Sequence, residues 1–268
     1  MDDAIANYYA NTAEEDRLAQ GAALLEEART RELIQRHVPA PPAVVLDVGG
    51  GAGAYAFWLA ELGYHVHLVD ATPRLIDEAR RRSVGRRPLA SSSVGDARAL
   101  EFPDNTADIV LLLGPLYHLT AGADRANALA EANRVLKRAG WLFGAVISRW
   151  ASALDGLSRD LLQDPRFAAI VKRDLAEGQH RNPTERSDYF TTAYFHQPTE
   201  AVTEVGAAGF RDPRIYAIEG PGWLLPDVPE RMRDPRRRAD LLEVARSLES
   251  EPALLGASAH LLVVARKP

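Results

Sequence analysis

The string DVGGGAG, residues 47–53, constrains the fold of this chain more than any other stretch. It follows an apolar run of strand type, Val44–Val48, and precedes a segment whose apolar residues have helical spacing. Glycine loses more conformational freedom on folding than other residues, so a glycine cluster costs free energy unless bare backbone is needed. We therefore expect a tight strand-to-helix turn that a ligand approaches closely.

Strand-like and helix-like segments alternate around this string. Apolar runs of strand type are expected at residues 44–48, 65–69, 89–94, 108–113 and 141–148. Helical spacing lies between them, and a first helix is expected over 12–36 because Thr12 and Glu15 form a capping-box pattern. This alternation is typical of a parallel sheet covered by helices on both faces.

The alternation breaks at residues 149–197 and then resumes. Helical patches and the aromatic string YFTTAYFH occupy this stretch, which we interpret as an insertion over the functional edge of the sheet. Helices are expected again at 198–208 and 238–250, and strands at 214–218 and 260–265. We expect an N-terminal helical flap at 1–42, a Rossmann-like domain at 43–148 and 198–268, and an inserted cap at 149–197.

The composition excludes several classes of protein. Of the 268 residues, 46% are hydrophobic and 26% charged, which is ordinary for a soluble globular chain. The net charge of −5 disfavours a broad contact with nucleic acid. The absence of cysteine excludes disulfides, thiolate zinc sites and cysteine nucleophiles. The polar N-terminus is no signal peptide and no apolar run reaches membrane-spanning length, so a cytoplasmic protein without membrane partners is expected.

Two classes of ligand use a glycine-rich turn at this place in a parallel sheet. A dinucleotide puts its pyrophosphate at the helix N-terminus, whereas S-adenosylmethionine (SAM) puts its sulfonium amino-acid part over the loop. The dinucleotide fingerprint is matched formally by G-A-G-A-Y-A from Gly51. Asp47, however, lies two residues before Gly49, and a carboxylate there suits the cationic groups of SAM better than a phosphate.

Further acids follow the next strands. Asp70 ends the second strand, where a carboxylate can accept hydrogen bonds from both ribose hydroxyls, a need that NAD and SAM share. Asp96 follows the third strand, in VGDA. The carboxyl ends of parallel strands meet at one edge, so these acids and Asp47 are expected to flank the same ligand.

The string D-x-G-x-G-x-G, together with these acids, resembles motif I and the neighbouring strand ends of class I SAM-dependent methyltransferases. The likeness covers residues 44–148 strongly and the last strands weakly. It implies a doubly wound, Rossmann-like α/β fold with a seven-stranded, mostly parallel sheet whose last strand is antiparallel. The strings GPLYHLT, AVISRWAS and YFTTAYFH, with an N-terminal YY, look like a bacterial, methyltransferase type 11/25-like group that acts on small molecules.

The resemblance also implies how SAM is held. The glycine loop would lie under its amino-acid part, Asp70 at the ribose and Asp96 at the adenine amino group. The first helix offers an arginine for the SAM carboxylate, although a surface ion pair with Glu26 is an alternative for it. The expected cofactor-binding residues are Tyr8, Arg29, Asp47, Gly49, Gly50, Gly51, Asp70, Ala71, Asp96, Ala97, Leu113 and Gly114.

The loop after the fourth strand carries the candidate catalytic residues, His118 and Tyr117. Methyl transfer is an in-line displacement that depends mainly on alignment, and a base is needed only when the nucleophile must lose a proton. Histidine is the best side-chain base near neutral pH. The alternatives are that His118 bonds the backbone or caps the next helix, and that Tyr117 lines the SAM site.

Aromatic side chains of the flap and the insertion suggest a site for an apolar or planar acceptor, although packing within the cap is an alternative for many of them. The candidate substrate residues are Tyr9, Tyr117, Trp150, Tyr194, His196 and Trp223. No H-x-E or other metal-ligand spacing occurs, so no metal is predicted.

Together these patterns favour a SAM-dependent methyltransferase that methylates an O, N or C nucleophile of a small, apolar or aromatic molecule, such as a natural product. An RNA or protein methyltransferase, an NAD-binding oxidoreductase and a module that binds SAM without catalysis remain alternatives. A monomer or homodimer is expected.

Overall fold

The computed structural model describes residues 5, 8–9, 17–18, 20–184 and 186–268. The capping-box pair Thr12 and Glu15 lies outside them. The described helices are α2 (Ala23–Gln35), α3 (Ala54–Glu61), α4 (Pro73–Arg82), α5 (Pro115–His118), α6 (Gly122–Val135), α7 (Ala151–Ser158), α8 (Pro165–Glu177), α9 (Pro198–Ala207), α10 (Val228–Arg233) and α11 (Pro235–Leu248). The described strands are β1 (Val44–Val48), β2 (His65–Asp70), β3 (Ser91–Val94), β4 (Ala107–Leu112), β5 (Leu136–Ser148), β6 (Gln179–His180), β7 (Ala193–His196), β8 (Arg211–Ala217) and β9 (His260–Arg266).

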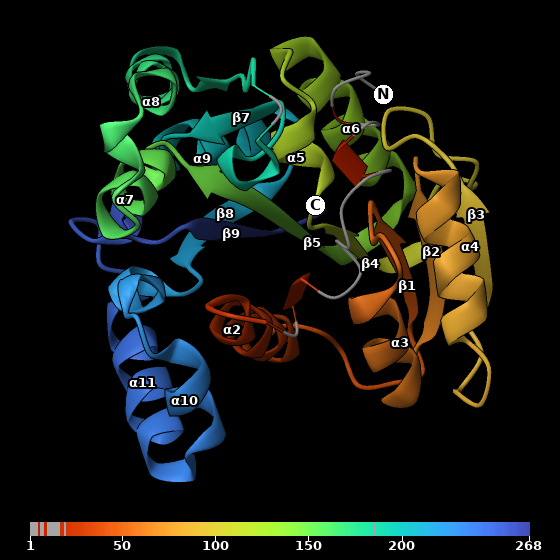
Figure 1. Cartoon of the computed structure of the whole chain (residues 1–268). Coiled ribbons are helices and arrows are strands. Elements are labelled where there is room, and N and C mark those ends of the chain that lie inside the picture. Colours follow the sequence, from red (N-terminus) through yellow and green to blue (C-terminus); the bar gives the residue numbers. More distant parts are fainter. Residues whose placement is uncertain (1–4, 6–7, 10–16, 19, 185) are drawn as a thin grey trace.

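One mixed sheet runs through the molecule in the order β3-β2-β1-β4-β5-β7-β6, with β9 pairing both β5 and β8 (Figure 1). The neighbours from β3 to β5 are parallel, and β9 is antiparallel to β5 and to β8. The predicted fold class, a mostly parallel α/β sheet with an antiparallel end, is confirmed. The described sheet has nine strands rather than the predicted seven.

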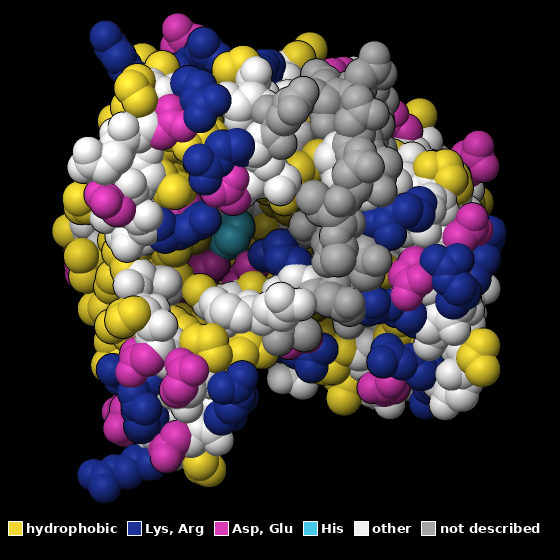
Figure 2. All heavy atoms as spheres, in the orientation of Figure 1, with side chains coloured by type: hydrophobic (Ala, Val, Ile, Leu, Met, Phe, Trp, Pro, Cys, Tyr) yellow, Lys and Arg dark blue, Asp and Glu magenta, His cyan; other side chains and the backbone are white. Residues whose placement is uncertain are grey.

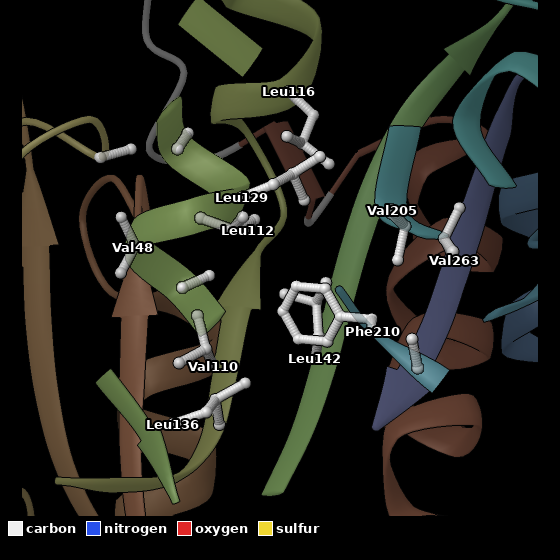
Figure 3. Close-up of a cluster of buried hydrophobic side chains, with 14 of the residues drawn as sticks. Val48, Val110, Leu112, Leu116, Leu129, Leu136, Leu142, Val205, Phe210 and Val263 are labelled. Atoms are coloured by element: carbon white, nitrogen blue, oxygen red, sulfur yellow. The ribbon is translucent and has the colours of Figure 1, made fainter. Parts of the chain in front are cut away.

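Helices cover both faces of the sheet, as the continuous apolar strands require. Successive side chains of a strand point to opposite faces, so neighbouring residues of one strand belong to different cores. Val110 and Leu112 of β4 pack with α6 and α9 in the cluster that Figure 3 shows. Ile109 and Leu111 of the same strand pack with α2, α3 and α4 on the other face.

The extra strands come from the inserted segment. The string YFTTAYFH was not predicted to contain a strand, but β7 pairs parallel with the end of β5 through Ile147 and Phe195, and β6 pairs antiparallel with β7. Helices α7 and α8 lie beside this extension, at the upper left of Figure 1. The domain boundaries stay a prediction.

Strand β9 brings its first residue to the functional edge of the sheet. Because β9 runs against β5, His260 pairs with Ile147 near the carboxyl end of β5. The residues that follow β8 reach the same edge, since the Ile218 N–H donates to the carbonyl of His260 at 3.1 Å. The ends of the parallel strands and the start of β9 therefore meet at one rim.

No helix among the described residues is both long enough and apolar enough to span a bilayer. Helices α10 and α11 pack on each other and on α2, and they extend away from the sheet at the lower left of Figure 1.

The glycine loop after β1 is held against the loop after β4. Gly49 has φ +72°, and a Cβ on it would lie 2.5 Å from Cδ of Pro115. The Gly49 N–H donates to the carbonyl of Val69 at 2.7 Å, which ties the loop to β2 as well. Gly51 has φ +58°, but a Cβ there would meet no atom closer than 3.9 Å, from Leu75. The two glycines are therefore needed for different reasons.

This difference predicts how alanine acts at each position. Gly51→Ala should cost about 1 kcal/mol, because alanine is strained in the left-handed region. Gly49→Ala should cost a further ~1–3 kcal/mol, because its Cβ also collides with Pro115. Urea unfolding of the two variants and the wild type measures both costs. Equal losses would contradict the contact between the two loops.

Candidate functional site

A cavity of about 450 Å³ lies over the carboxyl ends of β1, β2 and β4. Its walls come from the glycine loop, from the loops after β2, β3 and β4, and from the described part of the N-terminal segment. We call this space the first cavity. Figure 2 shows the same face of the molecule, with a hollow beside the atoms drawn in grey in which acidic, basic and histidine side chains are visible.

The Asp70 carboxylate stands at the centre of the loop network. Its Oδ2 accepts a hydrogen bond from the N–H of Gly51, and its Oδ1 accepts one from the N–H of Thr72, both at 2.8 Å. The side chain is buried, and burial raises its pKa above the usual value. Each oxygen keeps lone-pair capacity for one more donor, and Asp70 lines the first cavity.

Asp47 lies beneath the glycine loop instead of in the cavity wall. A Cβ on Gly50 would be 2.5 Å from Asp47 Oδ2. Both carboxyl oxygens of Asp47 are buried, and no described residue hydrogen-bonds them. Burial first, and then the nearby Asp70 carboxylate, raise the pKa of Asp47 to about 7. A buried acid without a partner favours a cation nearby.

Asp96 is held by a neighbouring arginine. Arg98 donates to both oxygens of Asp96, at 2.6 Å from Nη2 and 3.0 Å from Nε, and its Nη1 donates to Asp124 at 3.0 Å. The hydrogen bonds from Arg98 lower the pKa of Asp96. All three residues line the first cavity, so the carboxylate faces it in an ionised form.

A second cavity of about 240 Å³ adjoins the first. The residues Tyr9, Arg17 and Tyr117 line both spaces. Most of its remaining wall is aromatic or apolar and comes from the N-terminal segment, the inserted segment, the edge of the sheet and the segment after β8. This wall includes Tyr8, Ile147, Ala151, Phe167, Tyr189, Phe190, Phe195 and Trp223.

Tyr9 and His118 meet at the junction of the two cavities. The Tyr9 hydroxyl lies 2.6 Å from His118 Nε2, and His118 Nδ1 lies 3.3 Å from the carbonyl of Thr192. A carbonyl only accepts, so Nδ1 carries the proton and Nε2 accepts the O–H of Tyr9. Burial lowers the pKa of His118 to about 4, so the ring is uncharged near neutral pH.

Most of the predicted cofactor residues surround the first cavity. Its lining includes Gly49, Gly50, Gly51, Asp70, Ala71, Asp96, Ala97, Leu113 and Gly114. The candidate catalytic residues Tyr117 and His118 line it too. Tyr8, predicted beside the cofactor, lines the second cavity instead, and its ring packs edge-on against Phe190.

The structure places Arg29 away from both cavities, which corrects its expected role at the SAM carboxylate. Its fully buried guanidinium pairs with Glu32 at 2.6 Å and with Glu249, and it donates to the carbonyl of Ile218. Arg17, which the sequence analysis did not select, lines both cavities and pairs with Glu26 at 2.6 Å. Its only sequence signal is its place in the same N-terminal segment as Tyr9.

Three predicted substrate residues also lie outside the described lining of the cavities. The Tyr194 ring stacks under the guanidinium of Arg125, 4.0 Å from the ring centre. His196 is fully buried, with Nε2 3.4 Å from Glu204. Trp150 packs against Gly256. These side chains hold the inserted segment on the sheet, whereas Tyr9, Tyr117 and Trp223 do line the second cavity.

His260 and its acidic neighbours were also missed. His260 lines the second cavity, and ligand atoms of Glu26, Glu219 and His260 lie within 4.8 Å of one another. The sequence placed His260 at the start of a strand without saying which edge of the sheet it would reach. The prediction that no metal is bound stays a prediction.

Comparison with known proteins finds a family model that matches part of the chain. Residues 46–144 match the sequence model of a family described as "Methyltransferase domain". The chain has the fold of a class I methyltransferase. The match covers β1 to the middle of β5, which is the part that builds the first cavity.

Curated relatives are similar to this chain over part of its length, and the chain spans little more than half of the first of them. A ubiquinone/menaquinone biosynthesis C-methyltransferase of Ruegeria sp. is 33% identical over 151 residues, 53% of this chain and 58% of that protein. An uncharacterized methyltransferase of Mycobacterium bovis is 29% identical over 204 residues, 75% of this chain and 76% of that protein. The phosphoethanolamine N-methyltransferase of Triticum aestivum matches over 18% of its own length.

Solved structures share the fold. A SAM-dependent methyltransferase of Mesorhizobium loti superposes with a TM-score of 0.61 at 16% identity, over 91% of this chain and 100% of that one. Phosphoethanolamine N-methyltransferase 2 of Haemonchus contortus, in complex with SAM, gives 0.58 at 18% identity, over 90% of this chain and 52% of that one. SAM is the cofactor that these neighbours support. The residues here fit it, since the bare glycine loop, the remaining acceptor capacity of Asp70 and the unpartnered Asp47 suit a cationic, ribose-bearing ligand.

The unpartnered Asp47 makes the stability of the ligand-free protein depend on pH. Its folded pKa of about 7 lies above the ordinary value of 3.8, so the folded state binds more protons than the unfolded state between these values. Stability should therefore fall as pH rises through this window, by about 2.5 kcal/mol between pH 5 and pH 8. Asp47→Asn removes this titration and should flatten the dependence.

Urea unfolding across that pH range measures the effect, and Asp240→Asn, at an exposed position of α11, is the control. Parallel pH curves for Asp47→Asn and the wild type would show that Asp47 ionises normally.

Proposed function

We propose that this chain is an enzyme that transfers the methyl group of SAM to an O, N or C nucleophile of a small, apolar or aromatic molecule. The observation that carries the proposal is the pair of adjoining cavities. The first cavity is built from the glycine loop and carboxylates, and the second is mainly aromatic. Tyr9 and Tyr117 line both cavities. A donor and an acceptor in these spaces would meet at that shared wall.

The first cavity has the groups that SAM needs. When bound, SAM supplies an electrophilic methyl group on a sulfonium. The loop of Gly49, Gly50 and Gly51 leaves backbone open to the ligand, and Asp47 beneath it contributes negative charge once a cation lowers its pKa. Asp70 offers an oxygen for each ribose hydroxyl, and Asp96 accepts from an amino group on adenine.

The Tyr9–His118 pair closes the junction over the reacting groups. The neutral His118 ring holds the Tyr9 hydroxyl at 2.6 Å, and Arg74 donates to the carbonyl of Tyr9 at 2.7 Å. These contacts fix the tyrosine across the boundary between the two spaces and exclude water from it. A pKa of about 4 makes His118 a weak base, so we assign it mainly to positioning, with Tyr117 in contact with both ligands.

The second cavity favours a small acceptor. The second cavity has a volume of about 240 Å³ and walls lined mostly by aromatic rings. Such a space suits a compact planar molecule better than a nucleic acid or a protein substrate. The net charge of −5 also weighs against RNA. A role in natural-product biosynthesis, a cytoplasmic location and a monomeric or homodimeric state belong to this proposal. NAD chemistry is disfavoured by the family, and a binding module without turnover is an outcome of the tests.

Calorimetry with SAM, S-adenosylhomocysteine and NAD tests the donor site. The wild type should bind the first two and not NAD. Asp70→Ala should weaken SAM binding by about tenfold to a hundredfold, because it removes a charged acceptor and frees the Gly51 and Thr72 N–H groups. The control Asp240→Ala, on the exposed face of α11, should bind as the wild type does. Binding of NAD but not SAM would refute the proposal.

Paired variants test the closing contact. Tyr9→Phe and His118→Ala should each weaken S-adenosylhomocysteine binding by about tenfold, because each removes the same hydrogen bond at the edge of the first cavity. The double variant should lose little more than either single one, since the two groups act together. Additive losses measured by calorimetry would show that Tyr9 and His118 act separately.

A further inference from the structure

A histidine–glutamate pair lies at the wall of the second cavity, away from the glycine loop. His260 Nδ1 lies 2.6 Å from Glu219 Oε1, so the ring donates to the carboxylate. Glu219 Oε2 accepts from the Ser258 hydroxyl at 2.7 Å and from the His260 N–H at 3.1 Å. The N–H groups of Glu219 and Gly220 donate to the Ser258 oxygen at 3.1 Å. These contacts leave the carboxylate 2% exposed and fixed in orientation.

The charged groups around His260 favour its protonated form. Glu26 of α2 lies 3.7 Å from Nδ1, and Arg17 binds both oxygens of Glu26 at 2.6 and 2.9 Å. Burial lowers the pKa of His260, but Glu26 and Glu219 outweigh it and raise the pKa to about 8. Arg17 opposes them, and it lines the same cavity as Asp155 of α7 and Asp188.

The second ring nitrogen of His260 is the group that remains for a ligand. Among the described residues nothing hydrogen-bonds Nε2, and this atom is not among the buried polar atoms without partners. The side chain is 21% exposed and lines the second cavity. The hydroxyl of Ser152, buried in the same wall, also has no hydrogen-bond partner among these residues. The aromatic cavity thus offers a buried hydroxyl and an accessible, carboxylate-oriented imidazole.

We propose that His260, oriented by Glu219, is the general base of the reaction and that the acceptor is an aromatic alcohol in the second cavity. This proposal rests on the proposed methyl transfer. The hydroxyl proton moves to Nε2 of His260, and the oxygen forms a bond to the methyl carbon. The bond from that carbon to sulfur breaks and its electron pair stays on sulfur. The products are an aryl methyl ether, S-adenosylhomocysteine and an imidazolium paired with Glu219.

The dyad suits an alcohol better than the other nucleophiles. A neutral amine attacks through a lone pair and needs no base first, whereas a phenol is a poor nucleophile until it loses its proton. The carboxylate behind the ring stabilises the imidazolium that forms, as in other histidine–carboxylate pairs. A metal ion is a poorer fit, because Arg17 occupies both oxygens of Glu26 and the His260 ring occupies Glu219.

Binding of 4-nitrophenol tests the proton transfer without SAM. Its ionised form absorbs visible light, so adding wild-type protein at a pH below the pKa of the free phenol should produce the phenolate band, because the bound phenolate pairs with the imidazolium that His260 forms. His260→Gln should not produce it, and His65→Gln, at an exposed position at the start of β2, should behave as the wild type does. Binding without ionisation, the same band in His260→Gln, or no binding would overturn the assignment.

Turnover then separates this proposal from the proposed function. S-adenosylhomocysteine formation is measured with a panel of phenols, their methyl ethers and aromatic amines. Phenols should be methylated, with kcat/KM rising with pH to a plateau above about 8, where His260 loses its proton. His260→Gln should lower kcat at least about a hundredfold and lose this pH dependence, with SAM affinity unchanged.

Glu219→Gln should lower the pH of the plateau, because it removes one of the charges that favour the imidazolium. If Glu219 only joined β8 to β9, Glu219→Gln would change the stability of the protein but not the pH profile of kcat/KM. Absence of SAM binding would refute the methyltransferase itself. Three outcomes with SAM still bound would refute His260 as the base but not the SAM site. They are turnover of amines alone, undiminished turnover in His260→Gln, and the absence of any methylated phenol.

Discussion

The close packing of the glycine loop after β1 against the loop after β4 controls the geometry of this site. Gly49 approaches the Pro115 ring so closely that no Cβ fits between them, and the same residue is hydrogen-bonded to β2. The ends of β1, β2 and β4 are therefore held as one rigid rim. The carboxylate of Asp70 is fixed by N–H groups of that rim, so the donor site is largely preformed.

Electrostatics divides the rim into two halves. Around the glycine loop, Asp47 and Asp70 are buried acids whose pKa values are raised, because burial disfavours their charged forms until a cation is near. Around β9, each acid already has a basic partner, Glu26 with Arg17 and Glu219 with His260. The first half is suited to receive positive charge and the second to exchange a proton.

The sequence brought together most residues that line the first cavity, because the signals there are local. The strand, the glycine turn and the acids at strand ends lie within about fifty residues, and each follows from backbone geometry. Arg29 was assigned from its position on a helix, but its partner Glu249 is far away in the sequence. His260 reaches the site only because β9 is antiparallel to β5, and this pairing has no local signature. The strand β7 was missed because its aromatic residues were interpreted as cap packing.

The common wall of Tyr9 and Tyr117 has a thermodynamic consequence. A molecule that displaces either ring from one side alters the space on the other side, so the two occupancies are linked. This linkage is reciprocal. If the ligand of the first cavity changes the affinity for the ligand of the second by some factor, the second ligand changes the affinity for the first by the same factor. S-adenosylhomocysteine and the methylated product would thus each change the dissociation of the other through the rings of Tyr9 and Tyr117.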